Sequence, residues 1–394
     1  MRSDSAERPD SRHSWLVALA GAIGMVFTFG TPFSYGVLRA PLSEAFGISP
    51  IALSSVFSVM LFTFFIGSGL VGMFAARVPV RVVLLVCAAV AGAIAPALYV
   101  TGSYLGLLVV FALLGIALGT VFVLIASVVP RWFDERRGAA TGLIFVGNGL
   151  GLFVLPPVWQ FAIAEYGIDR AFLLIMAATA AAFLLTGLVC RRPRWTDGST
   201  ATVTEVLEWV GRLIGTRTFK LLFVGIAFAF SWYQLLAAFA VDLFAARGLT
   251  AAGASAAFGL IGGVSIVSRI GSGYLADRIG SRRSFLASLA CATVGIGLLF
   301  TSRPSLLAVA IVLLGIGLGG TATLYIPLLM EIYDPNRDTA IVGTFNVATG
   351  ISALAMPPLG TASVAYTDGY ALAVSLTLIV TVVSLWTVSV ATRP

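Results

Sequence analysis

The sequence predicts an all-α integral membrane protein in which 12 transmembrane helices form two pseudo-symmetric halves of six helices each. The first observation is composition: 59% of the 394 residues are hydrophobic and 10% are charged, against about 25% charged residues in soluble domains. The second is a repeat of short motifs about 200 residues apart. The third is the confinement of most charges to short segments between long apolar stretches, as in a membrane-spanning helix bundle.

Each predicted span is an apolar stretch close to the length of about 20 residues that a helix needs to cross a bilayer. Some spans open with helix-entry residues: Ser49-Pro50 places a cap before a first-turn proline, and Arg303-Pro304 opens another span. The predicted spans are residues 15–38, 50–75, 82–100, 104–128, 138–160, 170–190, 218–243, 251–276, 284–301, 304–330, 339–360 and 370–391.

Lysine and arginine are distributed unevenly about these spans. With a cytoplasmic N-terminus, 19 of the 24 lysine and arginine residues fall on the cytoplasmic side, 4 fall outside, and Arg269 lies within the membrane. This split satisfies the positive-inside rule, so the net charge of +7 needs no nucleic-acid partner. We predict a multi-pass protein with both termini cytoplasmic. The absence of long loops and of glycosylation sequons indicates a microbial plasma or inner membrane.

The repeat divides the chain into two parts. Residues 72–81 match 273–282 at an offset of 201, and Leu113–Gly119 matches Leu313–Gly319 at an offset of 200. Transporters built from two such halves bind substrate near the membrane midplane between them. We predict a polar cytoplasmic tail that includes His13, two six-helix halves, and a linker with an amphipathic interfacial helix. These parts are residues 1–14, 15–190, 218–391 and 191–217, respectively.

Arg269 is the only charged residue between Ala251 and Ala276. A lone arginine near the middle of a membrane helix costs about 2.5–3.5 kcal/mol on insertion scales, so it faces a polar cavity or a partner. No acid in the same helix neutralises it. Either an anionic ligand binds there, or a carboxylate or helix C-terminus of another helix pairs with the arginine. The usual role of intramembrane charges favours the ligand.

A second motif lies in the loop after this span. Residues 273–283 read Gly-x-x-x-Asp-Arg-x-Gly-x-Arg-Arg, and residues 72–81 are a degenerate copy. The motif resembles the loop signature of the major facilitator superfamily, and the resemblance implies the major facilitator fold. Asp277, Arg278 and Arg282 form the predicted cytoplasmic gate, in which Asp277 caps a helix or pairs with an arginine. The alternative is a tight loop that carries positive-inside charges.

Three places have a narrower resemblance, to the monocarboxylate transporter family. They are Phe33-Ser34-Tyr35-Gly36 followed by Arg39, the segment Trp132-Phe133-x-x-Arg136-Arg137 before span 5, and Arg269 in span 8. The resemblance implies proton-coupled transport of acids such as lactate or pyruvate, with Arg269 binding the carboxylate. Ser265 stands where the family often has an acid, so the coupling proton lacks its usual acceptor. Arg39 stands near the outer mouth, where it either steers anions or sits in solvent.

A small carboxylate binds best to one guanidinium together with a few hydrogen-bond donors and an apolar wall. Polar and aromatic residues in other spans are candidates for these roles. The alternative for each is helix packing or an interhelical hydrogen bond. Together with Arg269 and Ser265, the predicted substrate-binding residues are Thr28, Phe29, Phe145, Asn148, Tyr233, Tyr325 and Asn346.

Other classes of function are disfavoured. No HExxH motif, pair of acids or histidine lies within a span, and the cysteines Cys87, Cys190 and Cys291 are far apart. We therefore predict a monomeric transporter in lipid, not an enzyme, with no metal and no cofactor besides the coupling proton. The segment Phe345–Leu359 in span 11 holds no second cation, which favours a substrate with one negative charge. An anion exchanger of the oxalate/formate type and an exporter of another small organic solute are the alternatives.

Overall fold

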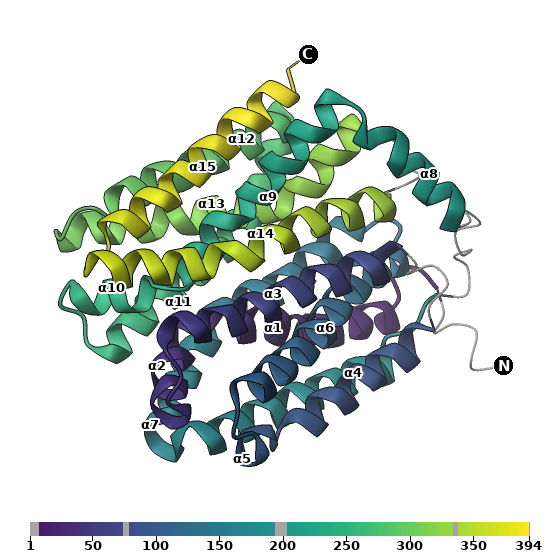
Figure 1. The fold of residues 1–394 in the computed structure, drawn as a ribbon. Helices are drawn as coiled ribbons and strands as arrows, with labels where there is room; N and C mark the ends of the chain where they lie inside the picture. Colours follow the sequence, from purple (N-terminus) through teal and green to yellow (C-terminus); the bar gives the residue numbers. More distant parts are fainter. Residues whose placement is uncertain (1–7, 74–78, 194–202, 334–337, 394) are drawn as a thin grey trace.

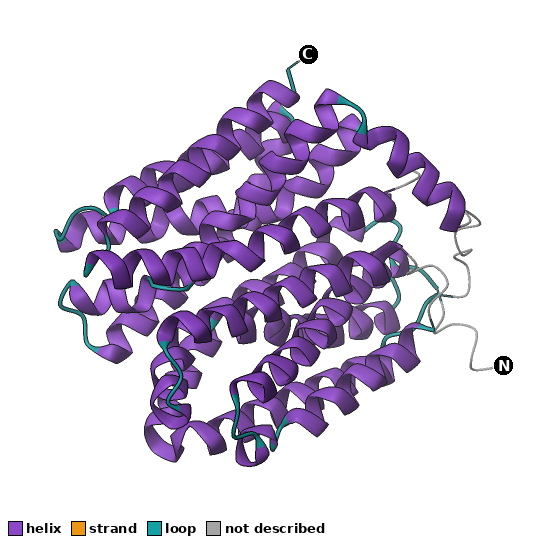
Figure 2. Ribbon diagram, viewed as in Figure 1, coloured by secondary structure: helices purple, strands orange, loops and turns teal. Residues whose placement is uncertain are grey.

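The computed structural model describes residues 8–73, 79–193, 203–333 and 338–393, which are helical apart from short connections (Figure 2). Parts of the predicted tail, of the first loop-motif copy and of the linker lie outside the described residues. The helices are α1 (Arg12–Phe33), α2 (Tyr35–Phe46), α3 (Pro50–Met73), α4 (Val80–Ile94), α5 (Ala97–Val100), α6 (Tyr104–Val128), η1 (Val129–Trp132), α7 (Arg137–Val189), α8 (Val203–Ile214), α9 (Arg217–Ala237), α10 (Ala240–Ala246), α11 (Ala251–Ile279), α12 (Ser281–Leu298), α13 (Pro304–Ile332), α14 (Asp338–Thr367) and α15 (Ala371–Ala391).

Among these described residues, nine helices are long and apolar enough to cross a membrane. One of them, α7, consists of two helical segments that correspond to predicted spans 5 and 6. The segments join at Gly167, whose φ of 77° and ψ of 168° are not helical. The shorter helices α4 and α12 occupy the third and ninth predicted spans. Every predicted span is therefore represented by a helix in the structure.

The turn between spans 5 and 6 differs from the prediction. The sequence suggested a connection between residues 160 and 170, whereas the helix continues to Gly167 and resumes directly after it. Glycine adopts such a positive φ without the steric cost that a Cβ imposes, so one residue is enough to reverse the chain. In contrast, predicted spans 1 and 7 are each divided into two helices. The first is divided into α1 and α2 at Ser34, and the other into α9 and α10 at Ala238–Phe239.

The start of α1 also lies earlier than predicted, within the expected polar tail. Ser11 caps the helix, because its hydroxyl oxygen accepts a hydrogen bond from the Ser14 backbone N–H at 3.2 Å. Just before it, the Asp10 carboxylate accepts backbone hydrogen bonds at 3.1 Å from each residue of 134–136. Partial desolvation raises the pKa of Asp10, but these hydrogen bonds and the charge of Arg136 outweigh it and lower the pKa overall.

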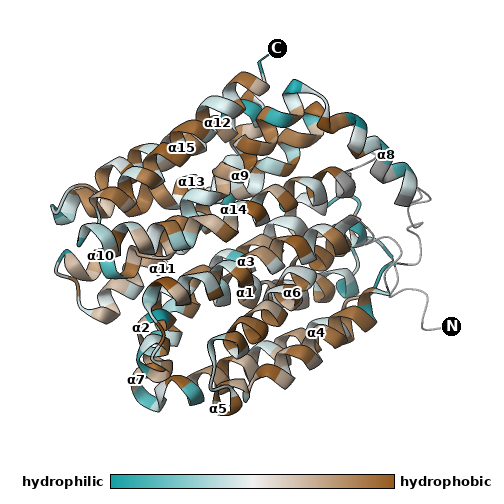
Figure 3. Ribbon diagram, viewed as in Figure 1, coloured by the Kyte–Doolittle hydropathy of each residue, from teal (hydrophilic) through white to brown (hydrophobic). Residues whose placement is uncertain are grey.

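The helices form two bundles side by side (Figure 1). The first contains α1, α3, α4, α6 and α7, and the second contains α9 and α11 to α15; they meet where α3 packs on α14 and α7 on α11. The start of α1 and the end of α15 lie at one end, here called the termini end, and α2, α5 and α10 lie at the opposite, far end. Hydrophobic residues cover the helices between the two ends (Figure 3). The predicted architecture of two halves is confirmed, and the cytoplasmic location of the termini stays a prediction.

Each half uses the same glycine contact to bring two helices close together. Gly119 on α6 lies so near α3 that a Cβ would overlap with the carbonyl of Phe64. The equivalent Gly319 on α13 is also close to α11, where a Cβ would overlap with the carbonyl of Ser265. Small residues allow such backbone approach in membrane helices. The contact on α13 holds α11, and with it Arg269, firmly within the second half.

Candidate functional site

Arg269 lies on α11 between the two halves and is 5% exposed. Its Nη2 donates a hydrogen bond to the Asn148 side-chain oxygen on α7 at 3.3 Å. Its guanidinium carbon lies 5.7 Å from the centroid of the Phe145 ring. The Nε–H is buried and has no hydrogen-bond partner, and in the described parts of the chain no carboxylate forms an ion pair with Arg269. The sequence left two interpretations, an anionic ligand or a pairing group on another helix. Among the described residues no acid pairs with Arg269, and the binding of a ligand there stays a prediction.

A small cavity surrounds this guanidinium. Its volume is about 30 Å³, room for roughly two water molecules. Both halves contribute to its wall, which is mainly aromatic. The lining residues are Phe29, Phe65, Phe122, Phe145, Asn148, Phe230, Arg269, Ala322, Tyr325 and Asn346.

A second polar link crosses between the halves beside the same cavity. The Tyr325 hydroxyl donates to the Asn346 side-chain oxygen at 3.3 Å, and the Asn346 amide donates to the Ser68 hydroxyl on α3 at 3.2 Å. The two asparagines therefore join the halves on both sides of the cavity, Asn148 through Arg269 and Asn346 through Ser68. In each link at least one of the two hydrogen-bonding groups is neutral. A ligand with stronger acceptors can therefore replace the acceptors of these hydrogen bonds.

Two larger cavities continue from this site to the termini end. One, of about 250 Å³, is bordered by Phe145, Asn346 and, at its outer limit, Arg131. The other, of about 990 Å³, opens between α7 and α11 and is bordered by Phe145, Arg269 and, near the start of α1, Trp15. Both cavities share lining residues with the central cavity and lie between it and the termini end.

The far end is closed by contacts between the halves. Arg39 on α2 forms an ion pair with Asp242 on α10, and its Nη1 donates to the Ala238 carbonyl at 3.1 Å. Below this pair, the Phe33 and Tyr233 rings lie 4.8 Å apart, and Tyr233 stacks on Phe258. The Arg39 side chain is 14% exposed, so the interpretation that it sits in solvent is wrong.

The structure brings together six of the nine predicted substrate-binding residues. Phe29, Phe145, Asn148, Arg269, Tyr325 and Asn346 line the central cavity. The other three do not line it: the Thr28 and Ser265 hydroxyls donate to carbonyls of their own helices, and Tyr233 belongs to the far-end closure.

Four cavity residues escaped the sequence analysis. Phe65, Phe122, Phe230 and Ala322 line the cavity, and all but Phe230 stand in helices with almost no difference in hydrophobicity between their faces. Such a helix has no polar face from which its rotation can be read. Only the pairing of helices shows which phenylalanines point inward. Phe29, for example, packs edge-on against Phe64 at 5.3 Å and close to Phe122.

Among the described residues, no hydrogen bond or ion pair of the predicted gate residues joins the two halves in this conformation. Asp277 is exposed and has no hydrogen bond or ion pair among the described residues. Arg278 stacks on Tyr274 in its own helix, and Arg282 donates to the Thr392 hydroxyl at 2.8 Å. The expected cap on the next helix comes instead from Glu331, whose carboxylate accepts from the Ser281 backbone N–H at 3.1 Å. The role of Asp277 in a gate stays a prediction, and it applies to a different conformation from this one.

A buried polar site lies between two helical halves that are closed at the far end and open toward the termini end. In this conformation the site is closed at one end, as in transporters whose two halves move around a substrate site between them. It contains no arrangement of nucleophile and base among the residues described.

Comparison with known proteins identifies the family. The family model described as Major Facilitator Superfamily matches residues 19–272 and 221–394. The chain belongs to this superfamily and is a secondary transporter, not an enzyme.

Several curated relatives are similar at low identity. "Monocarboxylate transporter 2" of Mesocricetus auratus is 25% identical over 401 residues, covering 92% of this chain and 80% of that one. "Monocarboxylate transporter 9" of Mus musculus is 27% identical over 195 residues, covering 48% of this chain and only 37% of its own length. "MFS-type transporter pytF" of Aspergillus terreus is 27% identical over 289 residues, covering 70% and 94%.

Solved structures show the same fold. A variant of the nucleoside transporter NupG superimposes with a TM-score of 0.75 over 96% of this chain and 100% of that one, at 12% identity. A bacterial homologue of the human lysosomal transporter Spinster, in an inward-facing and unoccupied conformation, gives a TM-score of 0.68 over 96% and 97%, at 15% identity.

Proposed function

We propose that this protein carries small monocarboxylates of the lactate or pyruvate kind, with Arg269 binding the carboxylate between the two halves. The observation that carries the proposal is the buried Arg269 guanidinium, whose Nε–H has no partner and which faces no carboxylate among the described residues. A buried charge is unfavourable unless it is paired. A carboxylate from the substrate supplies that pairing through two parallel N–H···O bonds.

The charge and the walls of the cavity favour a small acid with one negative charge. Arg269 is the only cation in the described lining of the central cavity, so a second carboxylate would be buried without a partner. The surrounding phenylalanines suit a short organic tail. The names of several relatives point to the same class of substrate, since they are called monocarboxylate transporters.

The coupling ion is less directly supported than the substrate. No aspartate or glutamate occurs among the described residues that line the central cavity or the two cavities leading from it. A proton bound next to Arg269 would therefore have to reside on the substrate itself. This feature supports a second candidate function, exchange of one small carboxylate for another as in oxalate/formate-type exchangers, because exchange requires no proton-binding residue.

Uptake of labelled L-lactate into proteoliposomes tests both candidate functions, proton-coupled transport and exchange. With an inward proton gradient, we expect uptake that pyruvate competes and that empty liposomes lack. A second arm replaces the gradient with unlabelled lactate or formate inside the vesicles. Uptake that needs internal carboxylate and ignores the gradient assigns exchange. Absence of uptake in both arms, from protein shown to be monodisperse, overturns the proposal that the substrate is a monocarboxylate.

A further inference from the structure

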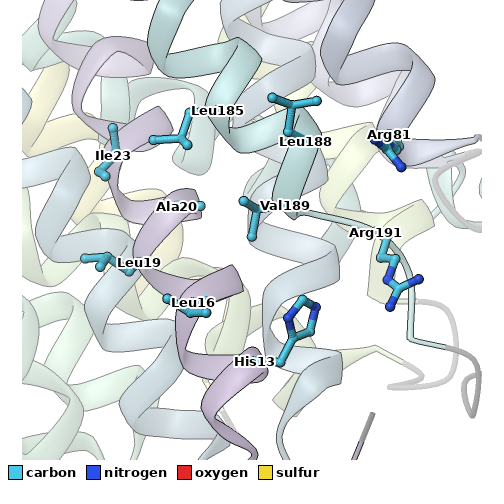
Figure 4. A pocket seen from close by; sticks show the side chains of 10 residues that line it. All are labelled: His13, Leu16, Leu19, Ala20, Ile23, Arg81, Leu185, Leu188, Val189 and Arg191. Atoms are coloured by element: carbon cyan, nitrogen blue, oxygen red, sulfur yellow. The ribbon is translucent and has the colours of Figure 1, made fainter. Parts of the chain in front are cut away.

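A groove on the outside of the first half shares no lining residue with the central cavity. It lies between α1 and the end of α7 at the termini end and has a volume of about 380 Å³ (Figure 4). Its lining contains two kinds of side chain: three basic groups and a set of aliphatic residues. Because transport through the central cavity does not involve this groove, its composition requires a separate explanation.

The basic groups come from three separate elements. His13 is the second residue of α1, Arg81 is the second residue of α4, and Arg191 follows the end of α7. Figure 4 shows Arg81 and Arg191 on one side of the groove and the aliphatic residues of α1 on the other. No acidic residue occurs in the described lining, so the described residues of the groove carry a net positive charge.

Trp132 holds two of these groups in place. The His13 ring packs edge-on against Trp132 with centroids 5.1 Å apart, and the indole N–H donates to the Arg191 carbonyl at 2.8 Å. The His13 Nε2 atom is buried and has no hydrogen-bond partner among the described residues. The cluster is therefore supported by packing and contains a polar atom that a ligand can satisfy.

The aliphatic part faces the surroundings of the protein. Leu16 and Leu19 on α1 are 57% and 51% exposed, and Leu188 on α7 is 53% exposed. Residues 16, 19 and 23 lie on one face of α1, because helix positions three and four apart are neighbours. In a bilayer this face contacts acyl chains, and it leads directly to the basic groups.

We infer that this groove binds an anionic phospholipid of the leaflet at the termini end. The phosphate lies among His13, Arg81 and Arg191, and the acyl chains lie along Leu16, Leu19 and Leu188. Basic pockets between membrane helices bind anionic headgroups in this way. The apolar face distinguishes the ligand from a free anion, and the basic groups distinguish it from a zwitterionic lipid.

The test uses the purified full-length protein in a neutral detergent. Phosphatidylglycerol and phosphatidylcholine with identical acyl chains are titrated, and bound lipid is counted by native mass spectrometry. We expect about 30-fold tighter binding of phosphatidylglycerol, from roughly 1 kcal/mol for each of two arginines. Glycerol phosphate, which has the headgroup but no chains, should neither displace the bound lipid nor raise the melting temperature as phosphatidylglycerol does.

Matched variants assign the preference to the groove. The double variant Arg81→Gln with Arg191→Gln should bind the two lipids equally, whereas Arg81→Lys with Arg191→Lys should keep most of the preference. Arg283→Gln with Arg393→Gln removes two exposed arginines from the second half and should leave the preference intact. Equal binding of both lipids by the unmodified protein, or an unchanged preference in the first variant, would overturn the inference; so would full displacement by glycerol phosphate.

Discussion

Arg39 and Arg269 are both arginines at the boundary between the halves, and their partners differ. Arg39 at the far end pairs with Asp242 and also donates to the Ala238 carbonyl. Arg269 at the centre donates to the neutral amide of Asn148, and its buried Nε–H has no partner among the described residues. An acid of the protein thus neutralises the first charge, and among the described residues no acid neutralises the second.

The difference between their partners matches two different roles. Arg39 suits closure of the far end, and Arg269 suits binding of the substrate. An ion pair between the halves stabilises the conformation in which they touch, and it breaks when they separate. An arginine without an acid cannot perform that role, but it can bind and release an anion that moves. From the sequence both arginines were candidates for attracting anions, so the position of Asp242 on α10 is what distinguishes them.

The largest effect is expected when the unpaired charge is removed. Arg269→Gln should lower carboxylate uptake at least about 30-fold, since losing one member of a buried charge pair costs about 2–5 kcal/mol. Initial rates in proteoliposomes measure the loss. Arg303→Gln, at an exposed position at the far end, is the control and should keep its rate. If Arg269→Gln retains more than half of the activity, Arg269 is not the carboxylate site.

A substitution on α7 can turn the unpaired arginine into a paired one. In Asn148→Asp, a carboxylate replaces the amide that Arg269 contacts at 3.3 Å, so it competes with the substrate. We expect the half-saturating lactate concentration to rise about tenfold, the effect of roughly 1.4 kcal/mol. Protonation of the new acid removes the competition, so the defect should diminish as the pH falls.

Two further variants provide comparison for this experiment. Asn148→Ala removes the hydrogen bond without adding charge and should have a smaller, pH-independent effect. Ser265→Asp places an acid four residues before Arg269 on the same helix, and it should introduce proton dependence if that position can pair with Arg269. A defect in Asn148→Asp that matches Asn148→Ala at every pH would argue against competition for the arginine.

Breaking the ion pair between Arg39 and Asp242 should change the equilibrium between conformations more than it changes substrate binding. Asp242→Asn leaves Arg39 without its acid and should open the far end more often. We expect a cysteine at Phe33, in a background without the three native cysteines, to react several-fold faster with a maleimide added from the far side. Arg39→Gln should produce the same change. Unaltered labelling in both variants would mean that the ion pair does not hold the far end closed.

The smallest effect is expected at the neutral link on the other side of the cavity. Ser68→Ala removes the acceptor of the Asn346 amide, and a hydrogen bond between membrane helices contributes about 0.6 kcal/mol on average. Uptake should change by no more than about threefold. A loss as large as that of Arg269→Gln would show that the two links are equally important and would remove the distinction between charged and neutral contacts.

Several features of the site were predictable because they are local. Arg269 is conspicuous in an apolar helix, and Asn148 and Asn346 are among the few amides in the spans. Tyr233 was predicted beside the substrate for a similar reason, and Ser265 from the family resemblance. The structure instead turns the Ser265 hydroxyl to the Gly262 carbonyl and places Tyr233 against Phe33. A hydroxyl in an apolar helix can bond to its own backbone, so its presence does not reveal a cavity.

The sequence by itself determined the membrane helices, the two halves and the buried cation, because hydropathy, repeat spacing and an isolated charge can be read along the chain. The tertiary structure decided which charges are paired. Arg39 and Asp242 are 203 residues apart, and Arg269 and Asn148 are 121 apart, so each contact depends on how one half is placed against the other. It also decided which phenylalanines face the cavity, because a helix that is apolar on all sides carries no pattern that specifies its rotation.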